Sequence, residues 1–317
     1  MLDGMGIARS IFPKACESQA IRGGLREEVA RVCGLRAGTP VVFGAADNAA
    51  GAVGLGVVRE GRAMASIGTS GVVLAATDRF VVEPAMRLHS FCHAIPERTY
   101  LMGVMLAAGG ALRWYRDVLC DGEKMAAEIR GADPYEIIAE AASTSREGAN
   151  GVVFLPYLMG ERTPYADASA RAAMVGMSAR TGKADVSRAI LEGITFGLAD
   201  SLDLVREVLG KDAVTQVRIT GGGAKSPFWQ KLMADVFGVE VALTTSTEGP
   251  AFGAAILAGV GAGSFSSVDE GEGALVHVTS HIEPEPTATS RYQEVHAIYR
   301  GLYRDLRERF RALSALG

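Results

Sequence analysis

Residues 214–237 read Val-Thr-Gln-Val-Arg-Ile-Thr-Gly-Gly-Gly-Ala-Lys-Ser-Pro-Phe-Trp-Gln-Lys-Leu-Met-Ala-Asp-Val-Phe. The β-branched residues at the start predict a strand over 214–220. A helix is predicted over 227–237, because proline suits a first helical position and the apolar residues that follow have helical spacing. Three glycines join the two elements. A strand that enters a helix through a glycine-rich turn is typical of an open α/β sheet, and ligands bind at such turns.

The segments on either side of this stretch show the same alternation of strands and helices. A hairpin is predicted from strands over 63–67 and 72–76, and residues 261–286 are predicted to form a loop. Further strands are predicted over 40–43, where the strand should be short and buried, and over 152–155 and 239–244. Helices are predicted over 101–119, 133–142, 185–209, 250–258 and 291–313. The whole pattern predicts an α/β fold.

Composition restricts the classes of function. The chain has 317 residues and a formal net charge of −4, so it lacks the global basic field that drives nucleic-acid binding, and a small-molecule partner is expected. Its four cysteines are far apart and form no CxxC pair, which argues against a zinc site or a disulfide scaffold. No signal peptide and no apolar run long enough to span a membrane is recognisable, so a cytoplasmic protein is expected.

Two glycine-rich turns are candidate nucleotide contacts. In the hairpin, Gly68-Thr69-Ser70 could turn successive N–H groups toward a phosphate, although an ordinary β-turn explains the same residues. The turn at 221–226 matches neither the GxxxxGK[ST] loop nor the GxGxxG fingerprint. A nucleotide contact built on another fold is therefore the remaining interpretation.

Asp47 is the candidate catalytic residue. It follows a predicted strand and stands among small, uncharged residues that leave space for a substrate. Phosphoryl transfer to an alcohol requires a carboxylate that accepts the hydroxyl proton. Capping of a helix N-terminus is an alternative role, because Asp before an alanine-rich segment is a good cap.

The motifs taken together resemble those of the FGGY carbohydrate kinases, in their order and in their spacing. The matching segments are Gly-Ala-Ala-Asp-Asn-Ala-Ala-Gly-Ala-Val-Gly (44–54), Ser-Ile-Gly-Thr-Ser-Gly-Val (66–72), Gly-Glu-Arg-Thr-Pro-Tyr (160–165), Leu-Glu-Gly-Ile-Thr-Phe (191–196), Thr-Gly-Gly-Gly-Ala-Lys-Ser-Pro-Phe-Trp (220–229) and Glu-Gly-Pro-Ala-Phe-Gly-Ala-Ala-Ile-Leu-Ala-Gly (248–259). The resemblance covers nearly the whole chain. It implies an actin-like, ribonuclease-H-like ATPase fold with two lobes that close over MgATP and a sugar.

The resemblance also implies roles for individual residues. Asp47 is expected to be the catalytic base, and Asp47 and Asn48 are expected to contact the sugar. The ATP contacts are expected at Gly68, Thr69, Ser70, Gly109, Gly222 and Ser226. No metal ligand is assigned, although ATP and Mg²⁺ are the implied cofactors. D-xylulose is the expected acceptor, but family members acting on it usually carry glycines where this chain has Ala45 and Ala46.

The family pattern further implies a division of the chain. Residues 1–58 are expected to be the tail of the N-terminal, sugar-binding lobe, and residues 59–317 the C-terminal, nucleotide-binding lobe. The Asp-x-Gly-Thr hairpin with which such kinases open does not occur here, so the isolated chain is expected to be inactive. The alternatives are a non-catalytic nucleotide-binding or interaction fragment and a kinase for another ketose or polyol. A homodimer is left open.

Other residues are assigned structural roles. His89 and His93 lie four residues apart in a strand-like segment, which favours packing over a metal pair. Glu161 and the neighbouring Arg162 are expected either to orient part of the cleft or to form an ion pair. Trp114 and Trp229 are expected in the core, because their apolar neighbours have helical spacing.

Overall fold

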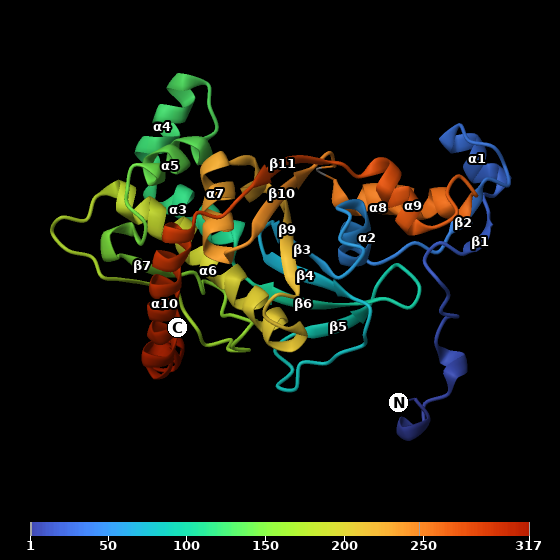
Figure 1. Ribbon diagram of the computed structural model, residues 1–317, viewed down its shortest axis with the longest axis horizontal. Coiled ribbons are helices and arrows are strands. Elements are labelled where there is room, and N and C mark those ends of the chain that lie inside the picture. The colour runs from blue at the N-terminus through green and yellow to red at the C-terminus, as the bar shows by residue number, and fades with distance from the viewer. Residues whose placement is uncertain (1, 247, 317) are drawn as a thin grey trace.

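The computed structural model describes residues 2–246 and 248–316. Its centre is a seven-stranded mixed sheet with the strand order β11-β10-β9-β3-β4-β6-β5 (Figure 1). Strands β3, β9 and β10 are parallel, and the other neighbouring strands are antiparallel. The bounds are β3 Gly61–Ile67, β4 Gly71–Thr77, β5 His89–Cys92, β6 Thr99–Met105, β9 Val214–Gly221, β10 Glu240–Thr244 and β11 Val278–Ile282. Separate antiparallel pairs are β1 Ile21–Gly24 with β2 Pro40–Val42, and β7 Val153–Leu155 with β8 Ala173–Val175.

Helices cover both faces of the large sheet. One face packs against α3 Gly109–Leu119, α5 Pro134–Ser143, α6 Lys183–Leu209, α7 Pro227–Phe237 and α10 Pro286–Ser314. The other face packs against α2 Asp47–Gly54, α8 Gly249–Gly261 and α9 Val268–Leu275. The remaining helices are α1 Glu27–Cys33 and α4 Asp121–Arg130, and 3-10 turns lie at Asp3–Met5, Arg9–Ile11, Ala149–Gly151 and Gly222–Lys225. The predicted α/β fold is therefore confirmed as a three-layer structure.

Strand β3 shows why the central strands are apolar on both sides. Ala63, Ala65 and Ile67 belong to the hydrophobic cluster beneath α6, whereas Met64 belongs to the cluster beneath α2 and α8. Successive side chains of a strand point to opposite faces, and both faces are covered here.

Most of the predicted elements are confirmed, including the hairpin, the strands near 152–155, 214–220 and 239–244, and the helices near 133–142, 185–209, 227–237 and 250–258. The helix predicted over 101–119 is wrong in its first part, because residues 101–105 belong to β6. Leu101 and Met105 face one hydrophobic cluster and Met102 the other, so this apolar run has no polar face that would reveal its period.

Three other predictions need correction. The loop predicted over 261–286 contains α9, which Ser267 caps by accepting the N–H of Glu270, and β11, which pairs with β10. The terminal helix begins at Pro286 rather than near 291, because Glu285 caps it. The strand near 40–43 exists, but Pro40 and Val41 are exposed rather than buried.

The segment before α2 differs from the rest of the molecule in burial. Strands β1 and β2 and helix α1 lie beyond α8 and α9 at one end of the molecule (Figure 1). Among residues 2–46, only Ala30 is buried. This segment therefore has almost no core of its own.

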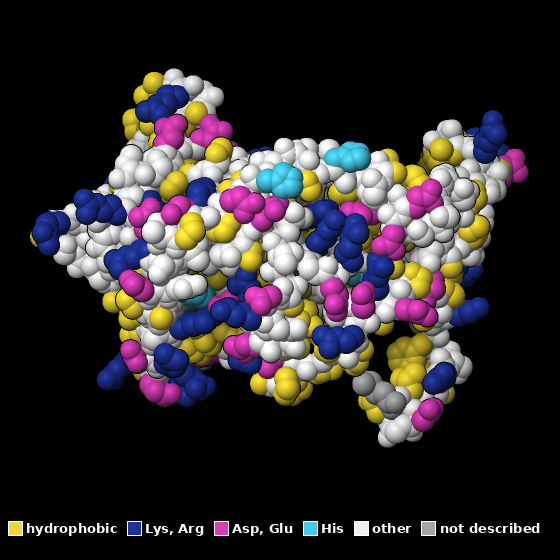
Figure 2. All heavy atoms as spheres, in the orientation of Figure 1, with side chains coloured by type: hydrophobic (Ala, Val, Ile, Leu, Met, Phe, Trp, Pro, Cys, Tyr) yellow, Lys and Arg dark blue, Asp and Glu magenta, His cyan; other side chains and the backbone are white. Residues whose placement is uncertain are grey.

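Charged side chains are interspersed on the visible surface. Figure 2 shows basic and acidic residues side by side over the face drawn, with no extended patch of one sign. None of the helices formed by residues 2–246 and 248–316 is long and apolar enough to cross a membrane.

Candidate functional site

The tip of the β3–β4 hairpin is bound to the beginning of α3. The N–H of Gly109 donates to the carbonyl of Gly68 at 2.8 Å, and the N–H groups of Ala108 and Gly110 donate to the carbonyl of Thr69 at 3.0 and 2.9 Å. A Cβ atom on Gly109 would lie 2.5 Å from the Gly68 oxygen, which is too close for any side chain. The predicted nucleotide residues 68–70 and 109 are thus brought together.

The turn after β9 reaches the same end of the sheet. Gly221 pairs with Ile67 in the parallel β3–β9 ladder, and its φ of 87° is suited to glycine. A Cβ on Gly221 would lie 2.4 Å from the Ile67 oxygen, and one on Gly223 would lie 2.9 Å from the Ile67 side chain. All three glycine segments predicted to contact nucleotide therefore converge where β3 ends.

The groups presented at this end suit an anion. Thr69 and Ser70 are exposed, and no hydrogen bond between described residues uses their N–H groups. Gly222 is exposed as well, with no heavy atom within 4 Å of the position of a Cβ. Ser226 has a visible structural role, because its hydroxyl caps α7 by accepting the N–H of Trp229 at 3.3 Å.

Sequence reasoning missed Arg113. This exposed arginine is in the second turn of α3, and its guanidinium donates to the hydroxyl of Thr69 at 3.5 Å. The signal was its position four residues after Gly109, which places both on one side of a helix. The hairpin tip thus has a guanidinium beside it, a group well suited to phosphate.

Asp47 is the first residue of α2 and does not cap it. The capping position is Ala46, so the cap interpretation of Asp47 is wrong. The exposed carboxylate accepts hydrogen bonds from the N–H of Asn48 at 2.7 Å and from its side-chain amide at 3.2 Å. Burial raises the pKa of Tyr100 on β6, and the negative charge of Asp47 raises it further. None of the hydrogen bonds of Asp47 or Asn48 reaches the glycine turns.

Helix α2 is fixed to α8 by glycines in direct contact. A Cβ on Gly54 would lie 2.0 Å from the carbonyl oxygen of Gly249, and one on Gly253 would lie 1.8 Å from that of Ala50. The two backbones therefore touch without intervening side chains. Such an approach leaves α2, and Asp47 at its start, little freedom relative to α8.

The strap, residues 55–58, joins α2 to β3 and is held by basic side chains. Each of its four carbonyl groups accepts a hydrogen bond from a different basic side chain. The pairs are Leu55 with Arg218, Gly56 with Arg62, Val57 with His93 and Val58 with Arg98. Cations at the C-terminal end of α2 also complement the helix dipole. Burial lowers the pKa of His93, so its neutral ring donates to Val57 through Nε2.

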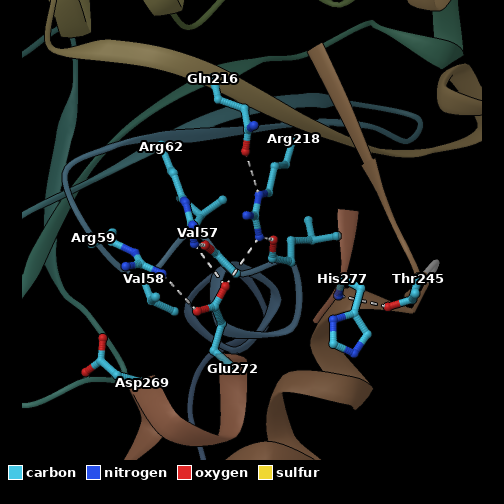
Figure 3. A network of polar contacts seen from close by, with 12 residues as sticks. Val57, Val58, Arg59, Arg62, Gln216, Arg218, Thr245, Asp269, Glu272 and His277 are labelled. Atoms are coloured by element: carbon cyan, nitrogen blue, oxygen red, sulfur yellow. Dashed lines mark hydrogen bonds and ion pairs between the residues drawn. The ribbon is translucent and has the colours of Figure 1, made fainter. Parts of the chain in front are cut away.

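One buried carboxylate lies beside two of these cations, Arg62 and Arg218. Figure 3 shows Glu272 of α9 between Arg59, Arg62 and Arg218. It contacts Arg62 at 2.9 Å and Arg218 at 3.5 Å, and it contacts the more exposed Arg59 at 3.4 Å. Burial and the neighbouring Arg62 lower the pKa of Arg218 to about 10. Glu272 opposes this fall and supplies a negative charge beside the buried guanidinium.

We expect Glu272→Gln to lower the free energy of unfolding by about 3–5 kcal/mol, because Arg218 would remain buried without its counter-charge. Urea denaturation of the purified chain measures the change. The matched control is Glu283→Gln, whose side chain is exposed and which should unfold within about 0.5 kcal/mol of the wild type. Equal stability of both variants would show that the strap does not need the buried charge.

The remaining predictions concern residues expected to have structural roles. Trp229 is buried and donates to Thr195 at 2.9 Å, which confirms its core position, and Trp114 stacks on Phe154. Of the two roles expected for Glu161, the ion pair is wrong, because Glu161 is buried and accepts N–H groups instead. The other role, orienting part of the cleft, stays a prediction. Within the described ranges, no group of three or more His, Cys, Asp or Glu residues could hold a metal ion.

Comparison with known proteins identifies the family. The model of the FGGY family of carbohydrate kinases, C-terminal domain, matches residues 63–262, and the model of the N-terminal domain of the same family matches residues 1–54. The chain therefore belongs to the FGGY family of carbohydrate kinases. The fold is accordingly the actin-like ATPase fold that structural neighbours in this family share.

Individual relatives are xylulose kinases. The protein from Staphylococcus epidermidis is 38% identical over 94% of this chain and 58% of its own length, and that from Escherichia coli K12 is 38% identical over 96% and 60%. The crystal structure of a xyloylose kinase from Brucella ovis has a TM-score of 0.82 and 35% identity, over 97% of this chain and 60% of its own. This chain thus spans about three fifths of the length of each of these three relatives.

Proposed function

We propose that this chain provides the nucleotide-binding part of a kinase that transfers the γ-phosphoryl group of MgATP to a hydroxyl group of D-xylulose. The observation that carries the proposal is the convergence of three glycine turns at the end of β3, in a chain 38% identical to xylulose kinases. We assign residues 59–317 to the nucleotide lobe. Residues 1–58 would be the tail of the sugar lobe.

The residues present fit the phosphates of a nucleotide. Gly68, Thr69 and Ser70 would hold the phosphate chain, because the N–H groups of Thr69 and Ser70 lie unused on an open hairpin tip, and the guanidinium of Arg113 beside this tip would add positive charge. Gly109, Gly222 and Ser226 would line the rest of the nucleotide site. ATP supplies the phosphoryl group and Mg²⁺ balances its charge.

Asp47 would accept the proton of the attacking sugar hydroxyl, and Asn48 would contact the sugar. The carboxylate is exposed, and among residues 2–246 and 248–316 Asn48 is its only hydrogen-bond partner, so it is free to accept a proton from a bound alcohol. The strap and α8 would hold it in place while the sugar lobe brings the hydroxyl group to it.

A second candidate is a fragment that binds nucleotide or a protein partner without turnover. For the chain alone, the near absence of buried residues among 2–46 favours this candidate. A segment with so little core would leave the sugar-binding lobe incomplete. The methyl groups of Ala45 and Ala46 beside Asp47 favour a further variant of the proposal, a kinase for another ketose or polyol.

We expect the chain to bind ADP weakly, and Gly222→Asp to weaken this binding by about tenfold or more. A carboxylate about 4 Å from a phosphate costs about 1–4 kcal/mol near a protein surface. Titration calorimetry of the purified chain measures the dissociation constant.

The control for this prediction is Gly222→Ala. Open space surrounds this position, so neither substitution should disturb the fold. Alanine adds no charge, so the ADP affinity of Gly222→Ala should be closer to that of the wild type than the affinity of Gly222→Asp is. Absence of heat with ADP and ATP at millimolar concentration, or unchanged binding by Gly222→Asp, would refute the nucleotide assignment.

A further inference from the structure

Glu161 is a buried carboxyl group to which the proposed reaction gives no role. It is only 2% exposed. Its Oε1 accepts the N–H of Leu106 at 3.0 Å and that of Arg162 at 2.7 Å. Its Oε2 is buried and has no hydrogen-bond partner among the described residues. A buried, half-satisfied carboxyl group is destabilising, so its presence calls for a reason.

The segment around Glu161 continues the edge of the sheet beyond β5. The N–H of Thr163 donates to the carbonyl of Val104 at 3.0 Å, and the N–H of Val104 donates to the Thr163 hydroxyl at 3.0 Å. The Glu161 carboxyl then accepts the N–H of Leu106, where a neighbouring strand would present a carbonyl. Glu161 therefore holds the point at which β6 ends.

The turn 106–110 connects Glu161 to the candidate nucleotide site. At its first residue, Leu106 is held by Glu161. At its other end, Gly109 and Gly110 donate to the carbonyls of Gly68 and Thr69 at the hairpin tip. Displacement of Leu106 would therefore move the residues that fix the hairpin.

We propose that Glu161 is a positioning residue for nucleotide binding, which holds the turn 106–110 against the hairpin in its neutral form and loosens it on losing its proton. This inference rests on the proposed nucleotide function. The neutral acid needs less solvation than the ion, whereas an ionised Oε2 would be a buried charge without a counter-ion.

The surroundings favour the neutral form. Burial raises the pKa of Glu161 to about 8, the two N–H donors oppose this rise, and the charge of Asp200 on α6 adds to it. Asp200 is itself bound by His296 and Arg300 of α10. Tyr299 of α10 also faces Glu161, and burial raises its pKa far above neutrality, so it stays uncharged.

The direction of the pH effect follows from this pKa. The folded protein keeps a proton that the unfolded chain releases above the ordinary pKa of a glutamate, so Glu161 makes folding less favourable as pH rises toward about 8. Above about 8 the folded protein loses the proton too. Nucleotide affinity should then fall by up to about tenfold per pH unit, the limit for one proton.

The test measures ADP binding from about pH 7 to about 9.5 for the wild-type chain, Glu161→Gln and Glu161→Ala. Glutamine offers the same acceptor oxygen without a proton to lose, so we expect wild-type affinity at neutral pH and a flat profile above it. Alanine removes both hydrogen bonds and should weaken binding about tenfold at every pH. Parallel profiles for wild type and Glu161→Gln would overturn the proposal.

A ligand-free measurement separates this inference from the proposed function. The amide NMR signals of Leu106 and Arg162 should titrate near pH 8 in the wild type and should not titrate in Glu161→Gln. If they titrate but no form of the chain binds ADP, the nucleotide function fails while the titration of Glu161 stands. If they do not titrate, the positioning switch is refuted whether or not ADP binds.

Discussion

Asp47→Asn should lower kcat by about a hundredfold or more in an enzyme made by joining this chain to the N-terminal part of a related xylulose kinase. Asparagine has the shape of aspartate and still accepts the N–H of Asn48 through Oδ1, but it cannot take a proton from the sugar. Asp47 stands at the start of a helix held by α8 and the strap, so the substitution should leave the fold intact. A coupled assay of ADP release measures kcat.

The KM for ATP separates a proton acceptor from a structural residue. A base that acts on the sugar hydroxyl should leave the KM for ATP nearly unchanged when it is removed. Asp212→Asn, at an exposed position, is the control and should retain full turnover. A kcat within about threefold of the wild type for Asp47→Asn would remove Asp47 from the chemistry.

Much of the end of the sheet where the glycine turns converge could be predicted from the sequence, because its geometry depends on glycine. Gly221 is needed where one backbone approaches another, and it stands out in the sequence as a glycine at the end of a predicted strand. Gly109 is needed for the same reason, but it lies inside the helix predicted over 101–119, so only the family resemblance singled it out. The local pattern could not show that these glycines meet. That follows from β9 pairing with β3, a contact between residues far apart in the chain.

The contacts of the strap could not be predicted, because the side chains that make them come from separate elements of the fold. Arg98, Arg218 and Glu272 are distant in sequence from the strap, and a lone charged residue is ordinarily interpreted as a surface group. Only the packing of α9 against the end of α2 reveals that they share one site. The prediction of a loop over 261–286 concealed α9 and therefore this site as well.

Glu161 shows a similar limit on the prediction of chemistry. Its sequence neighbour Arg162 suggested an ion pair, but the backbone aims the carboxyl group inward at Leu106. Whether a carboxylate is exposed and charged or buried and neutral depends on the tertiary fold. The motif 160–165 was therefore recognisable, while the sequence left open whether its acid orients part of the cleft or forms an ion pair.

Assayed alone, this chain should show no measurable phosphorylation of D-xylulose, whereas the joined enzyme should be active. The chain spans 58% and 60% of the two curated xylulose kinases compared above, and almost none of its residues 2–46 are buried. A sugar hydroxyl that is not held beside Asp47 must find it by diffusion. Loss of such alignment raises the barrier by about 7 kcal/mol or more, which is about 10⁵-fold in rate.

Three samples test this expectation with MgATP and D-xylulose: the chain alone, the chain mixed with an N-terminal fragment of a related xylulose kinase, and the joined protein. The ADP-binding measurement on the chain alone verifies that a negative result does not reflect misfolding. Robust turnover by the chain alone would contradict the need for a further sugar-binding part. A joined enzyme that prefers another polyol to every ketopentose would retain the kinase function but reject D-xylulose, and Ala45→Gly with Ala46→Gly would then show whether the two methyl groups beside Asp47 cause that preference.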